Sequence, residues 1–152
     1  MSEISFDVVV VGAGVIGLSI ARSLSDQGLS TVVLEKNSRS GDEISSRNSG
    51  VIHAGMYYEP DSLKSEFCIE GNRRLYDYCI QKKIKFEKTG KLIISSNAEE
   101  HNKLIKIFDR GIKKNINLEQ ISASEAKEIE PEITCYSGIL SPNTGLIDVP
   151  EF

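Results

Sequence analysis

A glycine-rich turn near the N-terminus is the part of this sequence whose residue types and spacing most directly predict chemistry. It consists of Gly12, Ala13, Gly14, Val15, Ile16 and Gly17, after an apolar run and before a helical pattern. In such a turn Gly12 permits the sharp bend, Gly14 lets backbone amides approach a pyrophosphate, and Gly17 lets the helix pack on the strand. The free amides at the start of the helix also attract phosphate. We therefore expect a dinucleotide-binding turn.

An acidic residue strengthens this interpretation. Glu35 stands eighteen residues after Gly17, where the next apolar run ends, with Lys36 beside it. A carboxylate there can accept hydrogen bonds from both hydroxyls of an adenosine ribose, and it would repel the 2′-phosphate of NADP. The alternative is a glycine turn without a ligand, but strand, helix and acid together favour binding. Glu35 and Lys36 are therefore expected in the cofactor site.

A second polar segment is a candidate for the rest of an extended cofactor. It contains Ser45, Ser46, Arg47, Asn48, Ser49 and Gly50, and His53 follows shortly after. Its hydroxyls, amide and small residues suit a pyrophosphate and a ribityl chain. Arg47 could neutralise phosphate or form a bidentate pair with a substrate carboxylate, and we favour phosphate. A polar surface loop without a ligand is the alternative, and the residues by themselves do not choose between FAD and NAD.

A strand–helix–strand unit must position these residues. The run Phe6–Val11 is apolar and β-branched, as in a parallel strand buried on both faces. Apolar residues recur every four positions from Val15 to Gln27, which predicts an amphipathic helix ended by Gly28. A second strand is expected at Thr31–Leu34, and residues 37–58 are expected to form a long loop.

The rest of the sequence predicts a mixture of helices and strands. A helix is expected from Pro60 and Asp61 to about Lys83. Its expected apolar stripe is Leu63, Phe67, Leu75 and Cys79. A strand pair is expected within Phe86–Ser96, around Thr89-Gly90. Capping patterns at Asn97/Glu100 and Ser122/Glu125 predict two more helices, and strands are expected at Gly138–Ser141 and Gly145–Val149.

Length, composition and charge exclude several classes of protein and of binding partner. With 152 residues, 39% of them apolar, and 26% charged, the sequence predicts a soluble folded domain. A net charge of −4 gives no reason to expect nucleic acid as a partner. The three cysteines lack metal-type spacing, so we expect reduced thiols and no metal site. No secretory signal or membrane span precedes the first strand, which predicts a cytoplasmic protein.

Several longer motifs resemble those of known flavin enzymes. They are Ser46–Tyr58, Ser62–Lys64, Cys68–Cys79, Thr89–Leu92 and Ser141–Asp148. On these residues the chain resembles the D-amino-acid oxidase and glycerol-3-phosphate dehydrogenase superfamily, and most closely its L-2-hydroxyglutarate dehydrogenase and oxidase group. The similarity extends over nearly the whole chain. Met56 departs from it mildly, since the group commonly has a branched aliphatic residue there.

This resemblance implies non-covalent FAD and an incomplete Rossmann-like α/β domain. It implies oxidation of a 2-hydroxy acid, L-2-hydroxyglutarate to 2-oxoglutarate, by hydride transfer to flavin N5. Oxygen or a quinone would accept the electrons, with peripheral contact at the inner membrane as one possibility. An amino acid or glycerol 3-phosphate is the alternative substrate, and a nucleotide-binding module without catalysis is the alternative outside enzymes.

Catalytic roles are expected chiefly at His53, which the resemblance places beside the reactive end of the flavin. It would polarise the flavin or the substrate, or act as the base; covalent flavin linkage and plain packing are alternatives. Tyr57 and Tyr58 could line a substrate cavity, although aromatic pairs are more often part of a core. His101, among polar residues, is expected to be a solvated surface residue.

The resemblance also predicts the domain organisation. Residues 1–84 would be the N-terminal part of the FAD-binding domain, residues 85–140 the beginning of an α+β substrate domain, and residues 141–152 a return toward the FAD domain. Members of the group are much longer, so we expect a separate chain or further sequence to carry the C-terminal half. The isolated chain is then expected to be marginally stable, to be inactive or nearly so, and to bind FAD weakly.

Overall fold

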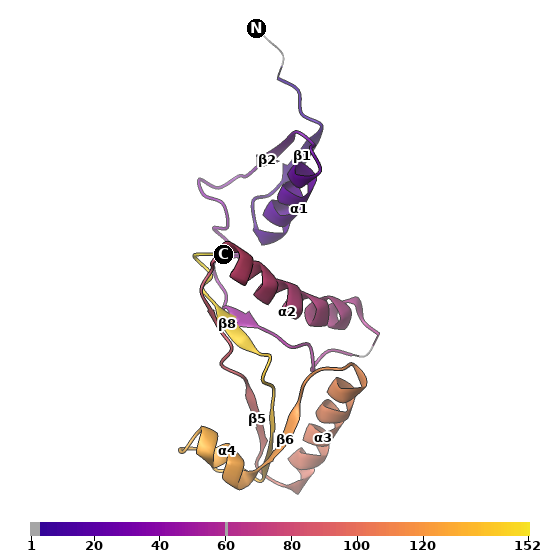
Figure 1. The fold of residues 1–152 in the computed structure, drawn as a ribbon, viewed down its shortest axis with the longest axis vertical. Coiled ribbons are helices and arrows are strands. Elements are labelled where there is room, and N and C mark those ends of the chain that lie inside the picture. The colour runs from indigo at the N-terminus through magenta and orange to yellow at the C-terminus, as the bar shows by residue number, and fades with distance from the viewer. Residues whose placement is uncertain (1–3, 60) are drawn as a thin grey trace. The chain divides into compact units, whose positions relative to one another are not determined.

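The computed structural model describes residues 4–59 and 61–152. The chain divides into two compact units, residues 1–49 (unit 1) and residues 50–152 (unit 2) (Figure 1). The two units are defined by how densely the residues within each of them contact one another. The boundary predicted from the sequence, between residues 84 and 85, separates an FAD-binding part from a substrate-binding part. It concerns function and not compactness, and it stays a prediction.

Unit 1 is the expected strand–helix–strand unit. Strand β1 (Val8–Val11) leads into helix α1 (Val15–Asp26), and strand β2 (Thr31–Leu34) follows (Figure 1). The two strands are parallel, with Val8 opposite Thr31 and Val11 opposite Leu34. A helix between two neighbouring parallel strands is the arrangement that the glycine turn requires.

The expectation that the first strand is buried on both faces is wrong for this chain. Val8 and Val10 are half-buried, whereas Val9 and Val11 are 53% and 84% exposed. Side chains alternate across a strand, so one face of β1 turns toward α1 while the other has no cover among the described residues of unit 1. Leu34 of β2, 54% exposed, lies opposite Val11 on the uncovered face.

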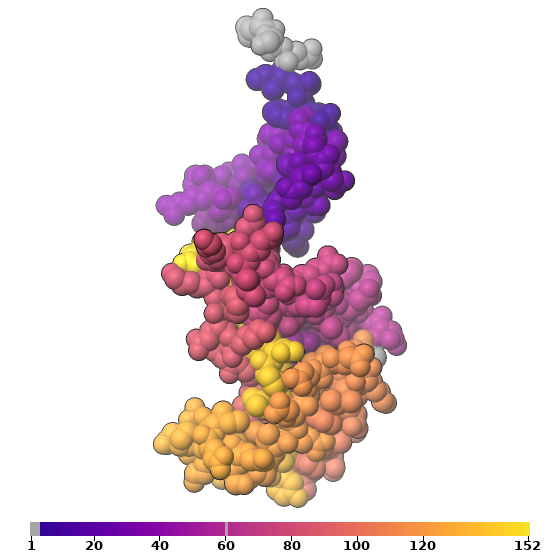
Figure 2. Space-filling model, in the orientation of Figure 1, coloured from indigo at the N-terminus to yellow at the C-terminus, as the bar shows by residue number. Residues whose placement is uncertain are grey.

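Unit 2 contains two small antiparallel sheets. In the first, β8 (Gly145–Ile147) lies between β3 (Val51–Ile52) and β4 (Phe86–Glu87). In the second, β7 (Ser137–Leu140) lies between β5 (Leu92–Ser95) and β6 (Glu119–Ser122). The mixture of these strands with helices confirms an α+β arrangement in the second half. Figure 2 shows part of the C-terminal segment, in yellow, at the surface between the segments of α2 and α3.

The pairing of these strands differs from the sequence expectation. Strands do form on either side of Thr89-Gly90, but β4 and β5 belong to different sheets and do not pair with each other. Likewise β7 and β8 follow one another in the chain, but they lie in different sheets and do not pair with each other. β3 lies within the segment expected to be a loop, and β6 was not predicted. All these pairings join residues far apart in the chain, which local patterns do not determine.

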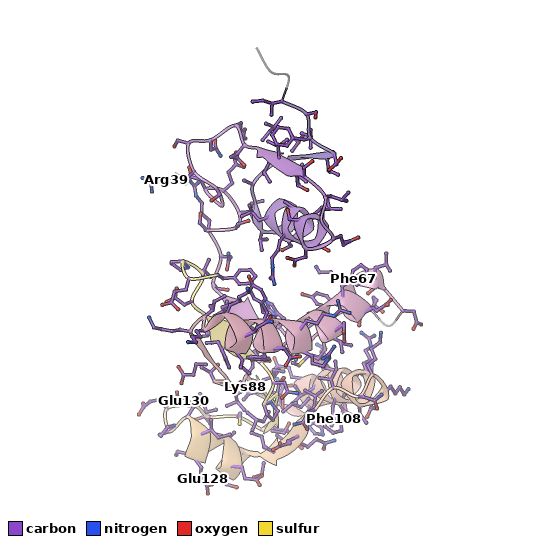
Figure 3. The ribbon with its side chains drawn as sticks, turned by 45° about the horizontal axis from the view of Figure 1, so that its top comes forward. Arg39, Phe67, Lys88, Phe108, Glu128 and Glu130 are labelled. Carbon is purple, nitrogen blue, oxygen red and sulfur yellow. The ribbon has the colours of Figure 1, made fainter. Side chains whose placement is uncertain are left out.

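Helix α2 (Leu63–Lys82) starts later than expected and buries only part of the predicted apolar stripe. Ser62 caps it by accepting a hydrogen bond from Ser65 N, while Pro60 lies outside the described residues. Leu63 and Phe67 of the predicted apolar stripe are 66% and 65% exposed (Figure 3). Cys79 of that stripe is buried as predicted and Leu75 is half-buried, but the other buried positions are Ser65 and Tyr76, which the stripe did not include. A helix with polar groups on its buried face has poor apolar periodicity, which explains the error.

Helices α3 (Ala98–Lys113) and α4 (Ala123–Ile129) confirm both capping patterns. The Asn97 side chain accepts a hydrogen bond from Glu100 N, and Ser122 and Glu125 form a reciprocal capping box. Leu104 of α3 is buried, and Phe108 packs beside it (Figure 3). They belong to the core of unit 2, whose buried members are Ala54, Met56, Leu104, Ile116, Leu118 and Ile139.

All three cysteines are free thiols, as expected. Cys79 is fully buried, and burial raises the pKa of its thiol. A buried thiol with a raised pKa is mostly protonated at neutral pH and therefore a weak nucleophile.

Candidate functional site

The glycine turn of unit 1 has the geometry that its sequence predicted. Gly12 has φ +100°, a conformation that favours glycine, and its N–H donates to Leu34 O at 2.7 Å. A Cβ at Gly17 would lie 2.0 Å from Gly12 O. Helix α1 therefore approaches the end of β1 so closely that a side chain at residue 17 would collide with backbone.

The start of helix α1 carries amides suited to an anion. Gly14 caps the helix without a side chain, and the first turn has no acidic residue. Val15 N donates to Ser45 Oγ at 2.9 Å, so an uncharged hydroxyl oxygen accepts from the first amide of the helix. Phosphate oxygens accept from amides at the same place in dinucleotide-binding turns. The residues of this turn thus fit a pyrophosphate, with Ser45 as a neighbour.

Glu35 is tied to the same turn. Its Oε2 accepts from Ala13 N at 2.7 Å and its Oε1 accepts from Asn37 N at 2.9 Å. These hydrogen bonds, from Asn37 first and then Ala13, hold the pKa of the Glu35 carboxyl below its usual value. The carboxylate is therefore ionised at neutral pH and connects the end of β2 to the glycine turn. Its expected contact with a ribose stays a prediction.

The other polar residues of unit 1 mostly shape the loop after β2. Lys36 Nζ pairs with Glu43 at 2.8 Å, which raises the pKa of Lys36. Ser46 Oγ donates to Glu43 O, and Asn48 Nδ2 donates to Ser45 O at 2.9 Å. Arg47 and Ser49 are exposed, as is Ile16. Ser45 contacts the turn through Val15 N, whereas the cofactor roles of the other residues stay predictions.

In unit 2, Gly50 and His53 flank strand β3. Gly50 O accepts from Ile147 N at 2.9 Å, so this glycine joins β3 to β8. The backbone of His53 is fixed by helix α2, since Asn72 Nδ2 donates to His53 O at 3.1 Å and Cys68 Sγ lies 3.6 Å from the same oxygen. His53 as a whole residue is exposed, although its ring is partly desolvated. A rigid backbone with a reachable ring suits a residue that contacts a ligand.

The Asn72 side chain is a positioning group that the sequence analysis missed. Its Nδ2 also donates to Asn143 O at 2.9 Å, and Tyr76 Oη donates to that carbonyl at 3.0 Å. Asn72 therefore links the segment of His53 to the turn between β7 and β8. Asn72 stands three residues before Leu75 and so shares a helix face with it, which was the available signal, because a polar residue on a buried face needs partners.

The pKa of the His53 imidazole lies below its usual value. Partial burial contributes most, and the positive charges of Lys91 and Lys64 add to it. Both causes disfavour the imidazolium form. A neutral imidazole at neutral pH can accept a proton, which the role of a general base requires.

His101 is not the solvated surface residue that its polar neighbours predicted. It is half-buried, its Nδ1 lies 2.7 Å from Ser137 Oγ, and its ring packs edge-on against Tyr136 at 5.6 Å. Ser137 Oγ also lies 2.7 Å from Ser95 Oγ. These contacts join α3 to the β5–β7 sheet, which makes His101 a structural residue.

Comparison with known proteins decides the family. The sequence model of the FAD-dependent oxidoreductase (DAO) family matches residues 7–152. The chain belongs to the FAD-dependent oxidoreductase family. Membership confirms the resemblance, the Rossmann-like fold class and the choice of FAD over NAD as cofactor.

The sequence is also similar to individual oxidoreductases. The chain is 42% identical over 147 residues to the mitochondrial L-2-hydroxyglutarate dehydrogenase of Arabidopsis thaliana, and 39% identical over 150 residues to that of Homo sapiens. These alignments include 96% and 97% of this chain, but only 30% and 32% of the two relatives. The chain thus spans about a third of the length of the relatives it matches.

A solved FAD-dependent oxidoreductase shows the same fold. The L-α-glycerophosphate oxidase of Mycoplasma pneumoniae, solved with FAD bound, superposes with a TM-score of 0.89 at 29% identity. The match includes 97% of this chain and 40% of that one. In the described part of the present chain, no helix has the length and apolarity needed to cross a membrane.

Proposed function

We propose that this chain provides the N-terminal FAD-binding region of an enzyme that oxidises L-2-hydroxyglutarate to 2-oxoglutarate. The observation that carries the proposal is the match of about 40% identity, over nearly the whole chain, to proteins named L-2-hydroxyglutarate dehydrogenase. A match that extends through both units includes the glycine turn and the segment of His53.

In this proposal, unit 1 holds the ADP part of the cofactor. The first amide of α1 and the Ser45 hydroxyl would contact the pyrophosphate, and Arg47 would add a positive charge. The Glu35 carboxylate would accept hydrogen bonds from the ribose while it keeps the turn in shape. When bound, FAD supplies the acceptor for the two electrons removed from the substrate.

His53 is the proposed base. Its neutral imidazole would take the proton of the substrate hydroxyl as the carbon that bears it is oxidised to a carbonyl. The lowered pKa favours the form that can accept this proton, and Asn72 keeps the residue in place. Removing the ring should therefore slow the oxidation more than it weakens substrate binding.

A second substrate is supported by one specific observation. The chain superposes with a TM-score of 0.89 on a protein named L-α-glycerophosphate oxidase. Glycerol 3-phosphate is also an alcohol with an anionic group, and a base at His53 would serve both substrates. The sequence identity to that oxidase, 29%, is lower than to the L-2-hydroxyglutarate dehydrogenases, which favours the 2-hydroxy acid.

The uncovered side of β1 and β2 supports the proposal that further polypeptide completes this enzyme. Sequence equivalent to the remaining length of the relatives, in this or in a separate chain, would cover Val9, Val11 and Leu34. Oxygen or a quinone as electron acceptor, a cytoplasmic location and contact with a membrane surface stay predictions.

The test is a reduction experiment without oxygen. The chain is purified with excess FAD, alone and together with polypeptide equivalent to the rest of a relative, and then mixed with each substrate. We expect L-2-hydroxyglutarate to bleach the flavin, and its D-isomer and glycerol 3-phosphate to leave it coloured. Bleaching by glycerol 3-phosphate alone would replace the proposed substrate, and flavin that binds without bleaching by any of them would favour a module without catalysis.

A further inference from the structure

Buried apolar side chains are divided very unevenly between the two units. Among the described residues of unit 1, only Ala13 and Ala21 are buried, and both side chains are small. Every large apolar side chain that is buried in the described part of the chain, such as Met56, Leu104 or Ile139, belongs to unit 2. Burial of apolar surface is the main favourable contribution to folding. Unit 2 therefore has a hydrophobic core, whereas unit 1 has almost none.

Unit 1 also lacks the cross-links that stabilise other small folded units. With residues 1–49, it is close to the size of about 40 residues below which a disulfide, a metal ion or association with another chain is usually needed. All three cysteines belong to unit 2, so unit 1 contains no disulfide. No group of metal-binding side chains occurs among the described residues of the chain. Unit 1 therefore depends for its stability on a bound ligand or on further polypeptide.

The hydrogen bonds between the parts of unit 1 converge on the glycine turn. Ala13 N donates to Glu35 Oε2 at 2.7 Å, and Val15 N donates to Ser45 Oγ at 2.9 Å. Gly41 N donates to Ala13 O at 2.8 Å. Such bonds contribute little net stability where water can replace either partner. A ligand bound at this turn would contact the same residues that join α1, the end of β2 and the following loop.

We propose that unit 1 is a cofactor-dependent folding unit, which the ADP half of FAD stabilises selectively, whereas unit 2 folds without a ligand. A ligand that binds only the folded form raises the folding equilibrium constant by the factor 1 + [L]/Kd. The ADP half suffices, because the residues expected to hold it, residues 12–17 with Glu35 and Ser45, all belong to unit 1. The inference rests on the part of the proposed function that assigns ADP binding to unit 1, and it is independent of the substrate.

The experiment is hydrogen exchange of the 152-residue chain, followed by mass spectrometry with and without ADP. Exchange of protected amides reports how often the unit that contains them opens. Without ADP, we expect the amides of β1, α1 and β2 to exchange about tenfold faster, or more, than those of β5, β7 and α3. ADP at about 100 times its Kd should slow exchange in unit 1 by up to about 100-fold and leave unit 2 unchanged.

Adenosine 2′,5′-bisphosphate is the matched ligand control. It is an isomer of ADP that carries one of its two phosphates on the ribose 2′-oxygen, where the Glu35 carboxylate would repel it. At the same concentration, we expect this isomer to leave exchange in unit 1 unchanged. The comparison separates recognition of the ADP half from general attraction of anions.

The variants are Ala21→Gly in α1 and, as the matched control, Ala126→Gly in α4. Each removes a buried methyl group from a helix, one in each unit. With ADP present, Ala21→Gly should speed exchange in unit 1 about fivefold, because glycine destabilises a helix. Ala126→Gly should leave exchange in unit 1 at the rate of the wild type.

Equally slow exchange in both units without ADP, no slowing of unit 1 by ADP, or slowing of both units alike would overturn the inference. The same holds for slowing by the isomer and for faster exchange of unit 1 in Ala126→Gly. Failure of the inference is distinguishable from failure of the proposed function. If ADP slows unit 1 alone but L-2-hydroxyglutarate never bleaches the flavin, the function is wrong. If the substrate bleaches the flavin while both units open together, only the inference is wrong.

Discussion

At the scale of single residues, the glycine turn shows how one missing Cβ determines local structure. The position that a Cβ would take at Gly17 is 2.0 Å from a backbone oxygen, which cannot move without displacing the end of β1. Gly71, in the middle of α2, has no heavy atom within 4 Å of its would-be Cβ apart from its chain neighbours and the nearby backbone of its own helix. The two glycines therefore provide a test and a matched control.

We predict that Gly17→Ala lowers the free energy of unfolding by about 1–3 kcal/mol, because the added methyl group overpacks the turn. Gly71→Ala should raise it by about 0.5–1 kcal/mol, since alanine restricts the unfolded chain and favours the helix. Urea unfolding followed by circular dichroism measures both. A Gly17→Ala protein as stable as Gly71→Ala would show that α1 does not approach β1 so closely.

Glu35 makes the stability of the folded chain depend on pH. Because its folded-state pKa is lowered, it stabilises the fold above the unfolded-state pKa and loses this effect as the pH falls through the folded value. We predict that Glu35→Gln has a lower urea midpoint than the wild type at pH 7. The difference should shrink below pH 4.5, the ordinary value for this carboxyl, and vanish at lower pH.

The control for Glu35 is Glu128→Gln on α4, where the described structure gives the side chain no hydrogen bond or ion pair (Figure 3). Its urea midpoint should follow that of the wild type throughout the same pH range. If Glu35→Gln also follows the wild type, its carboxylate does not hold the glycine turn.

At the scale of the elements, α2 organises unit 2 through polar groups on its inner face. Asn72 and Tyr76 both bond to Asn143 O, but Asn72 alone also bonds to His53 O. Removing Asn72 therefore breaks two contacts, whereas removing the Tyr76 hydroxyl leaves Asn143 O with one donor.

We predict that Asn72→Ala lowers the free energy of unfolding by about 1–3 kcal/mol and Tyr76→Phe by about 1 kcal/mol or less. Only Asn72→Ala should speed hydrogen exchange in the segment after His53, since it alone removes the amide hydrogen bond to the His53 carbonyl. Mass spectrometry of the exchanged peptides measures this. Equal exchange in both variants would mean that α2 does not fix the segment of His53.

At the scale of the whole molecule, exposed apolar residues on unit 1 predict its behaviour in solution. Val11 and Leu34 lie opposite each other on β1 and β2 and are 84% and 54% exposed. Exposed apolar strand residues promote self-association. The double variant Val11→Thr/Leu34→Thr keeps one β-branched residue and introduces another, so it should preserve the strands while making this face polar.

We predict that the double variant binds less of a hydrophobic dye and scatters less light than the wild type, with a similar urea midpoint. Val10→Thr is the control, because Val10 is half-buried and its side chain lies near the position a Cβ would take at Gly17. It should lower the midpoint instead, since it buries a hydroxyl. Unchanged dye binding in the double variant would mean that this face is not the apolar surface that associates.

The sequence by itself determined the features that depend on neighbouring residues. The glycine turn, α1, the parallel pair β1–β2 and the caps at Asn97 and Ser122 all agree with the structure, because φ angles, capping bonds and short-range periodicity are local properties. The motif around His53 also indicated the family that the comparisons confirmed.

Tertiary structure alone decided which distant residues meet. It separated β4 from β5, joined Asn72 to His53 and Asn143, and placed His101 against Ser137. Such contacts depend on the packing of whole elements and on hydrogen bonds between segments far apart in the chain. A local pattern carries no record of them, and for that reason the groups around His53 emerged only from the folded chain.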